Sequence, residues 1–115
     1  MADDCLFCQV LAGDLPSSEV ASTETTYAFR DIDPQAPTHV LVIPRRHITN
    51  AGELVPADGE VLMEMIAVAQ GVAASEGIAE SGYRLVFNVG DDAGNLVPHL
   101  HLHVLGGRQL GWPPG

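Results

Sequence analysis

The chain has 115 residues and a formal net charge of −10, with 15 acidic residues against five arginines and no lysine. This balance argues against nucleic-acid binding, which needs a basic surface, and the chain lacks the run of about 18 apolar residues that a membrane span requires. The length predicts a single domain over residues 1–115. The first residues, Met-Ala-Asp-Asp, lack the basic stretch of a signal peptide, so we expect a cytoplasmic protein without membrane partners.

The N-terminal part predicts a short helix followed by a hairpin. Apolar residues recur at helical spacing between Leu6 and Leu11, and Gly13–Pro16 contains the glycine and proline that end a helix. Glu19–Ser22 and Tyr27–Ile32 have the composition of two strands, and the polar segment between them is typical of a turn.

The middle of the chain predicts a buried strand and one long helix. Val40–Ile43 is a continuous aliphatic run, which favours a central strand covered on both faces. Apolar residues between Val61 and Ala73 follow helical periodicity, so we expect a helix from Ala57 or Asp58 to Glu76. A further strand is predicted over Tyr83–Val89.

The strongest functional pattern lies near the C-terminus. His99, His101 and His103 alternate with Leu100, Leu102 and Val104. A strand over this segment places the three imidazoles on one face and the aliphatic side chains on the other, with same-face neighbours about 6.6 Å apart. The only other histidines, His39 and His47, bracket the predicted central strand. Histidine confined to two short segments favours a functional site over a polar strand surface.

A cysteine pair, Cys5-Leu-Phe-Cys8, lies near the N-terminus. This spacing allows three interpretations: half of a zinc site, a redox pair, or two small buried side chains. A redox pair is normally followed by a helix within a βαβ unit, which this sequence does not indicate. Zinc needs two further ligands, and the chain has histidines to supply them.

His-Leu-His-Leu-His-Val-Leu resembles the signature of the histidine triad (HIT) superfamily, and the ending Gly-Gly-Arg-Gln-Leu-Gly-Trp-Pro-Pro-Gly resembles its Hint-like branch of nucleotide-binding phosphoramidases. The resemblance runs from about Cys5 to Gly115. It implies an α+β fold with a mainly antiparallel sheet of about five strands, one long helix and one short helix. It also implies a two-fold homodimer whose C-terminal tail, about residues 106–115 with Trp112, reaches the partner's active site.

The same resemblance implies the chemistry. The middle histidine, His101, attacks the α-phosphate of a purine nucleotide to give a covalent nucleotidyl-histidine. His103 then donates hydrogen bonds to the phosphate, His99 orients His101 or ligates zinc, and His39 supports the group from the neighbouring strand. We therefore expect an enzyme that hydrolyses nucleoside 5′-phosphoramidates of the AMP or GMP type, with no cofactor required for catalysis.

The resemblance further implies a nucleotide pocket. Asp31 corresponds to a carboxylate that accepts hydrogen bonds from ribose hydroxyls, and a carboxylate can accept two at once. The other residues carried over to the nucleotide are Leu6, Phe7, Val10, Phe29, Ile32, Asn88, Gly94, Asn95 and Leu96. Some members carry a serine where this chain has Leu96, and leucine offers the phosphate only its backbone amide.

Zinc is the cofactor that the resemblance suggests, because many members with such a cysteine pair have a tetrahedral site. Its ligands here are Cys5, Cys8, His47 and His99, and members without the cysteines bind no metal. Two other functions remain open. One is hydrolysis of dinucleoside polyphosphates, as in sister branches of the superfamily. The other is a non-catalytic zinc-binding or regulatory role, since alternating strand histidines can ligate a metal directly.

Overall fold

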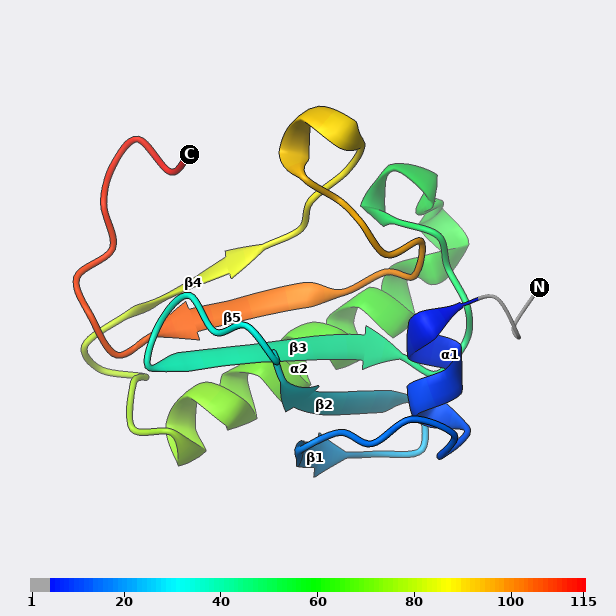
Figure 1. The fold of residues 1–115 in the computed structure, drawn as a ribbon, viewed down its shortest axis with the longest axis horizontal. Coiled ribbons are helices and arrows are strands. Elements are labelled where there is room, and N and C mark those ends of the chain that lie inside the picture. The colour runs from blue at the N-terminus through cyan, green and yellow to red at the C-terminus, as the bar shows by residue number, and fades with distance from the viewer. Residues whose placement is uncertain (1–4) are drawn as a thin grey trace.

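The computed structural model describes residues 5–115, and the N-terminal segment on which the predicted absence of a signal peptide rests lies outside this range. Within it, a five-stranded antiparallel sheet has the strand order β1-β2-β3-β5-β4. The strands are β1 (Glu19–Ser22), β2 (Thr26–Arg30), β3 (Thr38–Pro44), β4 (Tyr83–Val86) and β5 (Leu102–Gly106). The predicted α+β fold with one long and one short helix is confirmed (Figure 1).

The two helices lie on opposite faces of the sheet. The long helix α2 (Gly59–Ser75) packs Met65, Ala69 and Val72 against one face, where the buried side chains of β3 and β5 meet them. The short helix α1 (Leu6–Leu11) lies on the other face, where Phe7 contacts a smaller cluster with Phe29 and Leu41. In Figure 1, α1 covers only one end of its face, so part of the sheet beside it is left for a site.

The central strand β3 is buried along its whole length, as the aliphatic run predicts. Its side chains alternate, so Val40 and Val42 face α2 while Leu41 and Ile43 belong to the cluster under α1. His39 shares the face of Leu41. The register pairs Leu41 with His103 of β5, which brings His39 and His103 to the same part of the sheet.

Several predicted elements are longer than the observed ones. The second strand ends at Arg30 rather than Ile32, and β4 ends at Val86 rather than Val89, because the chain leaves the sheet there to form the pocket rim. The long helix begins at Gly59, after a 3-10 turn over Pro56–Asp58. Asp58 accepts a hydrogen bond from the Val55 amide within this turn.

The predicted histidine strand is wrong in extent, since β5 begins only at Leu102. His99 and His101 lie in the irregular segment before it, where the His99 amide donates to the Val97 carbonyl and the Leu100 amide to that of Ile48. The alternation nevertheless persists, because Leu100 and Leu102 both enter the α2 core. No helix among residues 5–115 combines the length and apolar character needed to cross a membrane.

Candidate active site

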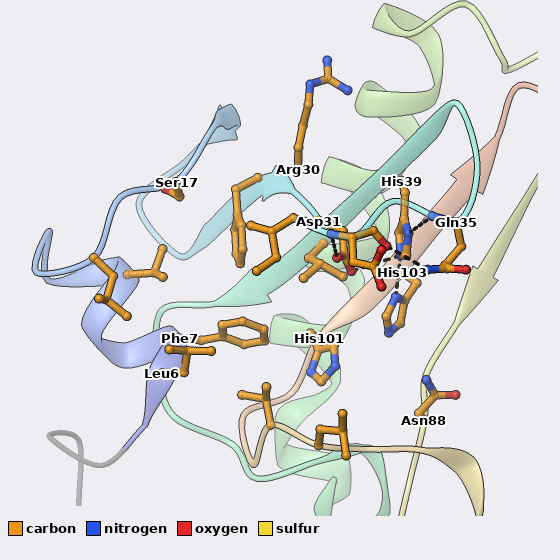
Figure 2. A pocket seen from close by; sticks show the side chains of 18 of the residues that line it. Leu6, Phe7, Ser17, Arg30, Asp31, Gln35, His39, Asn88, His101 and His103 are labelled. Carbon is orange, nitrogen blue, oxygen red and sulfur yellow. Dashed lines mark hydrogen bonds and ion pairs between the residues drawn. The ribbon is translucent and has the colours of Figure 1, made fainter.

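A cavity of about 660 Å³ opens on the sheet face beside α1. This volume is within the range of small-molecule sites in proteins. Figure 2 shows Phe7 of α1, Asp31 of the loop after β2, and the histidines His39, His101 and His103 around it, while Arg30 points away toward its ion pair with Glu76. Its lining comprises Leu6, Phe7, Val10, Leu15, Pro16, Ser17, Phe29, Arg30, Asp31, Ile32, Asp33, Gln35, His39, Leu41, Asn88, Gly94, Leu96, Val97, His101 and His103.

One end of the cavity is apolar and aromatic. The Phe7 and Phe29 rings meet edge to face with centroids 5.4 Å apart, and Tyr27 stacks on Phe29 at 5.6 Å. Leu6 and Ile32 stand at the rim with 49% and 98% of their surfaces exposed. Exposed aliphatic side chains beside a buried aromatic pair form a surface on which a planar, weakly polar ring can be buried.

The opposite end is polar and centres on His101. The His101 Nδ1 atom lies 2.7 Å from the backbone carbonyl oxygen of His99. A carbonyl only accepts, so Nδ1 carries the proton and Nε2 of the neutral ring keeps its lone pair. The Phe7 and His103 rings each lie 5.1 Å from the His101 ring, edge-on, and hold it between them. A fixed imidazole with a free Nε2 lone pair is a nucleophile or a general base.

His39 and His103 form a directed hydrogen-bond chain. The Gln35 backbone amide donates to His39 Nδ1 at 3.0 Å, so the neutral His39 ring carries its proton on Nε2. That nitrogen lies 2.9 Å from His103 Nδ1 and 3.4 Å from Asp31 Oδ2. The shorter contact makes His103 Nδ1 the acceptor and puts the His103 proton on Nε2. His103 Nε2 has no partner among the described residues, so a buried N–H donor is left for a ligand.

The titration of these histidines favours the neutral forms that this chain of hydrogen bonds requires. Burial, together with the neighbouring His101 and His39, lowers the pKa of His103 to about 4 against the opposing charge of Asp31. Burial also lowers the pKa of His39 against the opposing charges of Asp31 and Asp33. At neutral pH both rings are therefore uncharged and each has one donor and one acceptor.

A second group consists of potential metal ligands and includes His99, the residue whose carbonyl binds His101. The ligand atoms of Cys5, Cys8, His47 and His99 all lie within 4.8 Å of one another. The Cys5 and Cys8 sulfurs are 3.2 and 3.5 Å from His99 Nδ1, and the His47 and His99 Nδ1 atoms are 3.2 Å apart. His99 Nε2 donates to the Pro44 carbonyl at 2.9 Å, which directs the Nδ1 lone pair at the sulfurs. Two thiols and two imidazoles with this orientation fit a tetrahedral metal ion.

Asp31, His39 and His103 form another compact group of potential metal ligands. The hydrogen bonds of this group do not fit a metal ion. A metal on His39 Nε2 requires its proton to sit on Nδ1. Nδ1 faces the Gln35 amide, which is itself a donor, so the two hydrogens would collide. We therefore read this group as a hydrogen-bond chain and not as a metal centre.

Comparison with known proteins gives the family. The HIT domain family matches residues 12–110. The chain belongs to the HIT domain family. A purine nucleoside phosphoramidase of Escherichia coli is 43% identical over 111 residues, covering 96% of this chain and 93% of that protein. An uncharacterised HIT-like protein of Synechococcus elongatus is 42% identical over 115 residues, covering 100% of both chains.

Solved HIT structures have the same fold. A HIT family hydrolase from Legionella pneumophila superposes with a TM-score of 0.95 at 48% identity, covering 97% of this chain and 100% of that one. A HIT family hydrolase from Clostridium thermocellum has a TM-score of 0.92 at 43% identity and 95% coverage of both chains.

The structure brings together most of the residues that the HIT resemblance selected. His39, His101 and His103 line the cavity, as does every predicted nucleotide-binding residue except Asn95. The Asn95 backbone amide instead donates to the Gly90 carbonyl and closes the loop between these two residues. His99 is fully buried and belongs to the cysteine cluster by its side chain, while its carbonyl accepts the hydrogen bond from His101. Leu96 is 91% exposed at the rim.

Sequence reasoning missed two parts of this HIT site. One is the segment Leu15–Ser17, which closes the apolar end; the Ser17 hydroxyl is 2.7 Å from the Tyr27 hydroxyl. The other is Gln35, whose role is carried by its backbone amide and so leaves no signal in the side-chain pattern. The two prolines flanking Gln35 were the only indication that this loop has a fixed shape.

Proposed function

We propose that this HIT protein hydrolyses purine nucleoside 5′-phosphoramidates through a nucleotidyl intermediate on His101. The observation that carries the proposal is the His101 geometry, in which the His99 carbonyl occupies Nδ1 and leaves Nε2 free toward the cavity. The apolar end of that cavity and the relative named a purine nucleoside phosphoramidase support a purine nucleotide as the ligand.

In this proposal the nucleotide lies along the cavity. The purine packs between the Phe7 and Phe29 end and the exposed rim residue Ile32. Asp31 stands between this end and the histidines; its Oδ1 accepts from the Asp33 amide, and Oδ2 remains available to ribose hydroxyls. The phosphate is then placed at His101, with the backbone amides of Gly94 and Leu96 and the side chain of Asn88 as proposed donors.

The first step forms the intermediate. The His101 Nε2 lone pair attacks the phosphorus, the phosphorus–nitrogen bond of the substrate breaks, and its electron pair leaves with the amine. His101 gains positive charge, which the Nδ1–H bond to the His99 carbonyl stabilises. His103 Nε2–H donates to a phosphate oxygen. The departing nitrogen takes one proton from solvent water, because the neutral His103 keeps its only N–H for the phosphate oxygen.

The second step releases the product. Water attacks the phosphorus, the bond from phosphorus to His101 Nε2 breaks, and its electron pair returns to the imidazole. The water proton passes to the solvent and restores the proton that the amine removed. The product is a nucleoside 5′-monophosphate, and His101 is again neutral.

We also propose that Cys5, Cys8, His47 and His99 hold zinc. Zinc would supply a tetrahedral cross-link between α1, the chain after β3 and the segment before β5, and it would make no contact with the reacting atoms. Burial raises the pKa of the Cys8 thiol to about 11, with contributions from Cys5, so without a cation this thiol stays protonated and unreactive.

A homodimer is the proposed assembly. Strand β4 forms one edge of the sheet, and its Leu85 is exposed, as is Met63 on α2. An exposed sheet edge with apolar neighbours favours pairing with a second copy. Trp112 in the tail is 82% exposed, with the Arg84 guanidinium 5.9 Å from its ring centre, and we propose that it reaches the partner. A monomer at micromolar concentration would contradict this assembly.

The test of the function is turnover of adenosine 5′-phosphoramidate. We expect the wild type to release AMP, and His101→Ala to lose at least about 1,000-fold in kcat because the nucleophile is gone. Glu80→Ala, an exposed change outside the cavity, is the control and should match the wild type. Turnover of diadenosine polyphosphates in preference to the phosphoramidate would instead assign the chain to a different hydrolase activity.

A further inference from the structure

His99 links two sites through different atoms. Its side chain belongs to the cysteine cluster, with Nδ1 at 3.2 Å from Cys5 Sγ and 3.2 Å from His47 Nδ1. Its backbone carbonyl accepts the His101 Nδ1 proton at 2.7 Å. One residue therefore carries both a ligand atom of the cluster and the group that orients the proposed nucleophile.

The sheet does not hold this carbonyl in place. Strand β5 begins at Leu102, so His99 and His101 have no ladder partners on β3 or β4. The local backbone contacts are the bonds from the His99 amide to Val97 and from the Leu100 amide to Ile48. The Leu100 amide shares a peptide plane with the His99 carbonyl, so the direction of this carbonyl depends on the Ile48 carbonyl, which follows the ligand His47, and on how firmly the His99 side chain is held.

Helix α1 also links the cysteine cluster to His101, through the Phe7 ring. Cys8 lies next to Phe7, and the Phe7 ring packs edge-on against both His99 and His101, at 6.1 and 5.1 Å. Cys5 is the N-cap of α1, and its sulfur accepts the Cys8 amide. An ordered cysteine cluster thus fixes the ring that packs on His101 as well as the carbonyl that binds it.

We propose that Cys5, Cys8 and His47 form a positioning site for His101, which acts through the side chain and carbonyl of His99 when a metal ion joins the four ligands. The inference rests on the proposed function, because it concerns the nucleophile of that reaction. Without the ion the four ligand groups contact one another only through weak thiol and imidazole interactions, and the His99 side chain keeps its Nε2 bond to the Pro44 carbonyl. The His99 carbonyl then has more than one orientation, and His101 loses its single tautomer.

The test uses His47, the exposed ligand, which lies outside the cavity lining and touches no part of the proposed substrate. His47→Gln removes one ligand without opening the core. His47→Cys keeps four ligands as a Cys3His set, which also binds zinc. Leu11→Ala on α1 is the matched control, since it removes an apolar contact of the same small cluster and leaves all four ligands.

Four quantities are measured for each protein after incubation with zinc: bound zinc by elemental analysis, the His101 tautomer by nitrogen-15 NMR of the imidazole, the single-turnover rate of nucleotidyl transfer, and the dissociation constant of AMP. We expect His47→Gln to lose zinc and to show mixed His101 tautomers. Its nucleotidyl transfer should be about 10- to 100-fold slower than that of the wild type, while its dissociation constant for AMP stays within about 2-fold of the wild-type value. His47→Cys and Leu11→Ala should retain the wild-type tautomer and rate.

Two results would overturn the positioning site: a wild type that binds no zinc, or a zinc-free His47→Gln whose His101 tautomer and transfer rate equal those of the wild type. Failure of the proposed function is separate and is recognised by a wild type that forms no nucleotidyl adduct. The tautomer comparison between wild type and His47→Gln then still decides whether the cluster positions His101.

Discussion

Each imidazole of the pocket has one nitrogen engaged by a fixed partner, which gives the other nitrogen a single role. The His99 carbonyl engages His101, and the Gln35 amide engages His39. His39 in turn engages His103 and leaves the His103 Nε2 hydrogen unpartnered. The protonation pattern therefore follows from backbone groups, and it needs no charged residue to enforce it.

The hydrogen bond that His39 donates to His103 can be tested separately from the size of the His39 side chain. His39→Leu removes the donor to His103 Nδ1, so His103 can place its proton on either nitrogen and loses its fixed donor toward the phosphate. We expect kcat to fall about 10- to 100-fold with KM nearly unchanged. His39→Gln keeps a side-chain N–H donor and should recover part of the loss. Equal kcat in all three proteins, measured with the phosphoramidate, would show that this chain of hydrogen bonds has no role.

At the scale of elements, the alternation of histidine and aliphatic residues was sufficient to predict the two faces of the C-terminal segment. Leu100 and Leu102 enter the α2 core, and His101 and His103 face the cavity, as period two requires. The strand extent was wrong because pairing depends on the neighbours β3 and β4, whose contacts with this segment begin only at Leu102 and His103. A single sequence does not contain that register.

The loops explain the rest of the difference between sequence and structure. The sequence identified Asp31, Asn88 and Gly94 through resemblance, and the structure places them in the cavity lining. The contribution of Gln35 could not be predicted, since a backbone amide is common to nearly every residue. The double use of His99, by side chain and by carbonyl, likewise depends on the backbone path between Val97 and Leu102.

At the scale of the whole molecule, the buried histidines couple folding to pH. Burial lowers the pKa values of His39 and His99 and takes that of His103 to about 4, whereas unfolded histidine titrates near 6.5. The unfolded chain therefore binds more protons between these values. The stabilisation is complete above about pH 6.5 and is lost as the pH falls toward 4.

We expect the free energy of unfolding, measured by denaturant titration, to decrease from pH 7 to pH 4.5. His103→Asn should show a shallower decrease, because one of the groups that must stay uncharged is absent. Glu80→Ala serves as the control, since it changes an exposed carboxylate instead. If His103→Asn and the wild type lose stability in parallel, His103 titrates alike in the folded and unfolded chains, and the assigned neutral state is wrong.

Helix α1 lies on the sheet face that carries the cavity and the cysteine cluster, α2 lies on the opposite face, and β4, proposed for the dimer, forms one edge of the sheet (Figure 1). The chemistry thus depends on α1, β3 and the chain leading into β5. The acidic charge of −10 does not prevent phosphate binding in this arrangement, because the proposed donors are neutral N–H groups inside the cavity.

The assignment of His101 as the nucleophile is tested most directly by mass spectrometry of the wild-type protein, quenched during turnover of adenosine 5′-phosphoramidate under conditions that preserve acid-labile bonds. We expect a transient adduct with the mass of one AMP unit, located by peptide mapping on His101 and absent from His101→Ala. AMP release without any adduct, or an adduct located on His99 or His103, would contradict the assignment of His101 as the nucleophile.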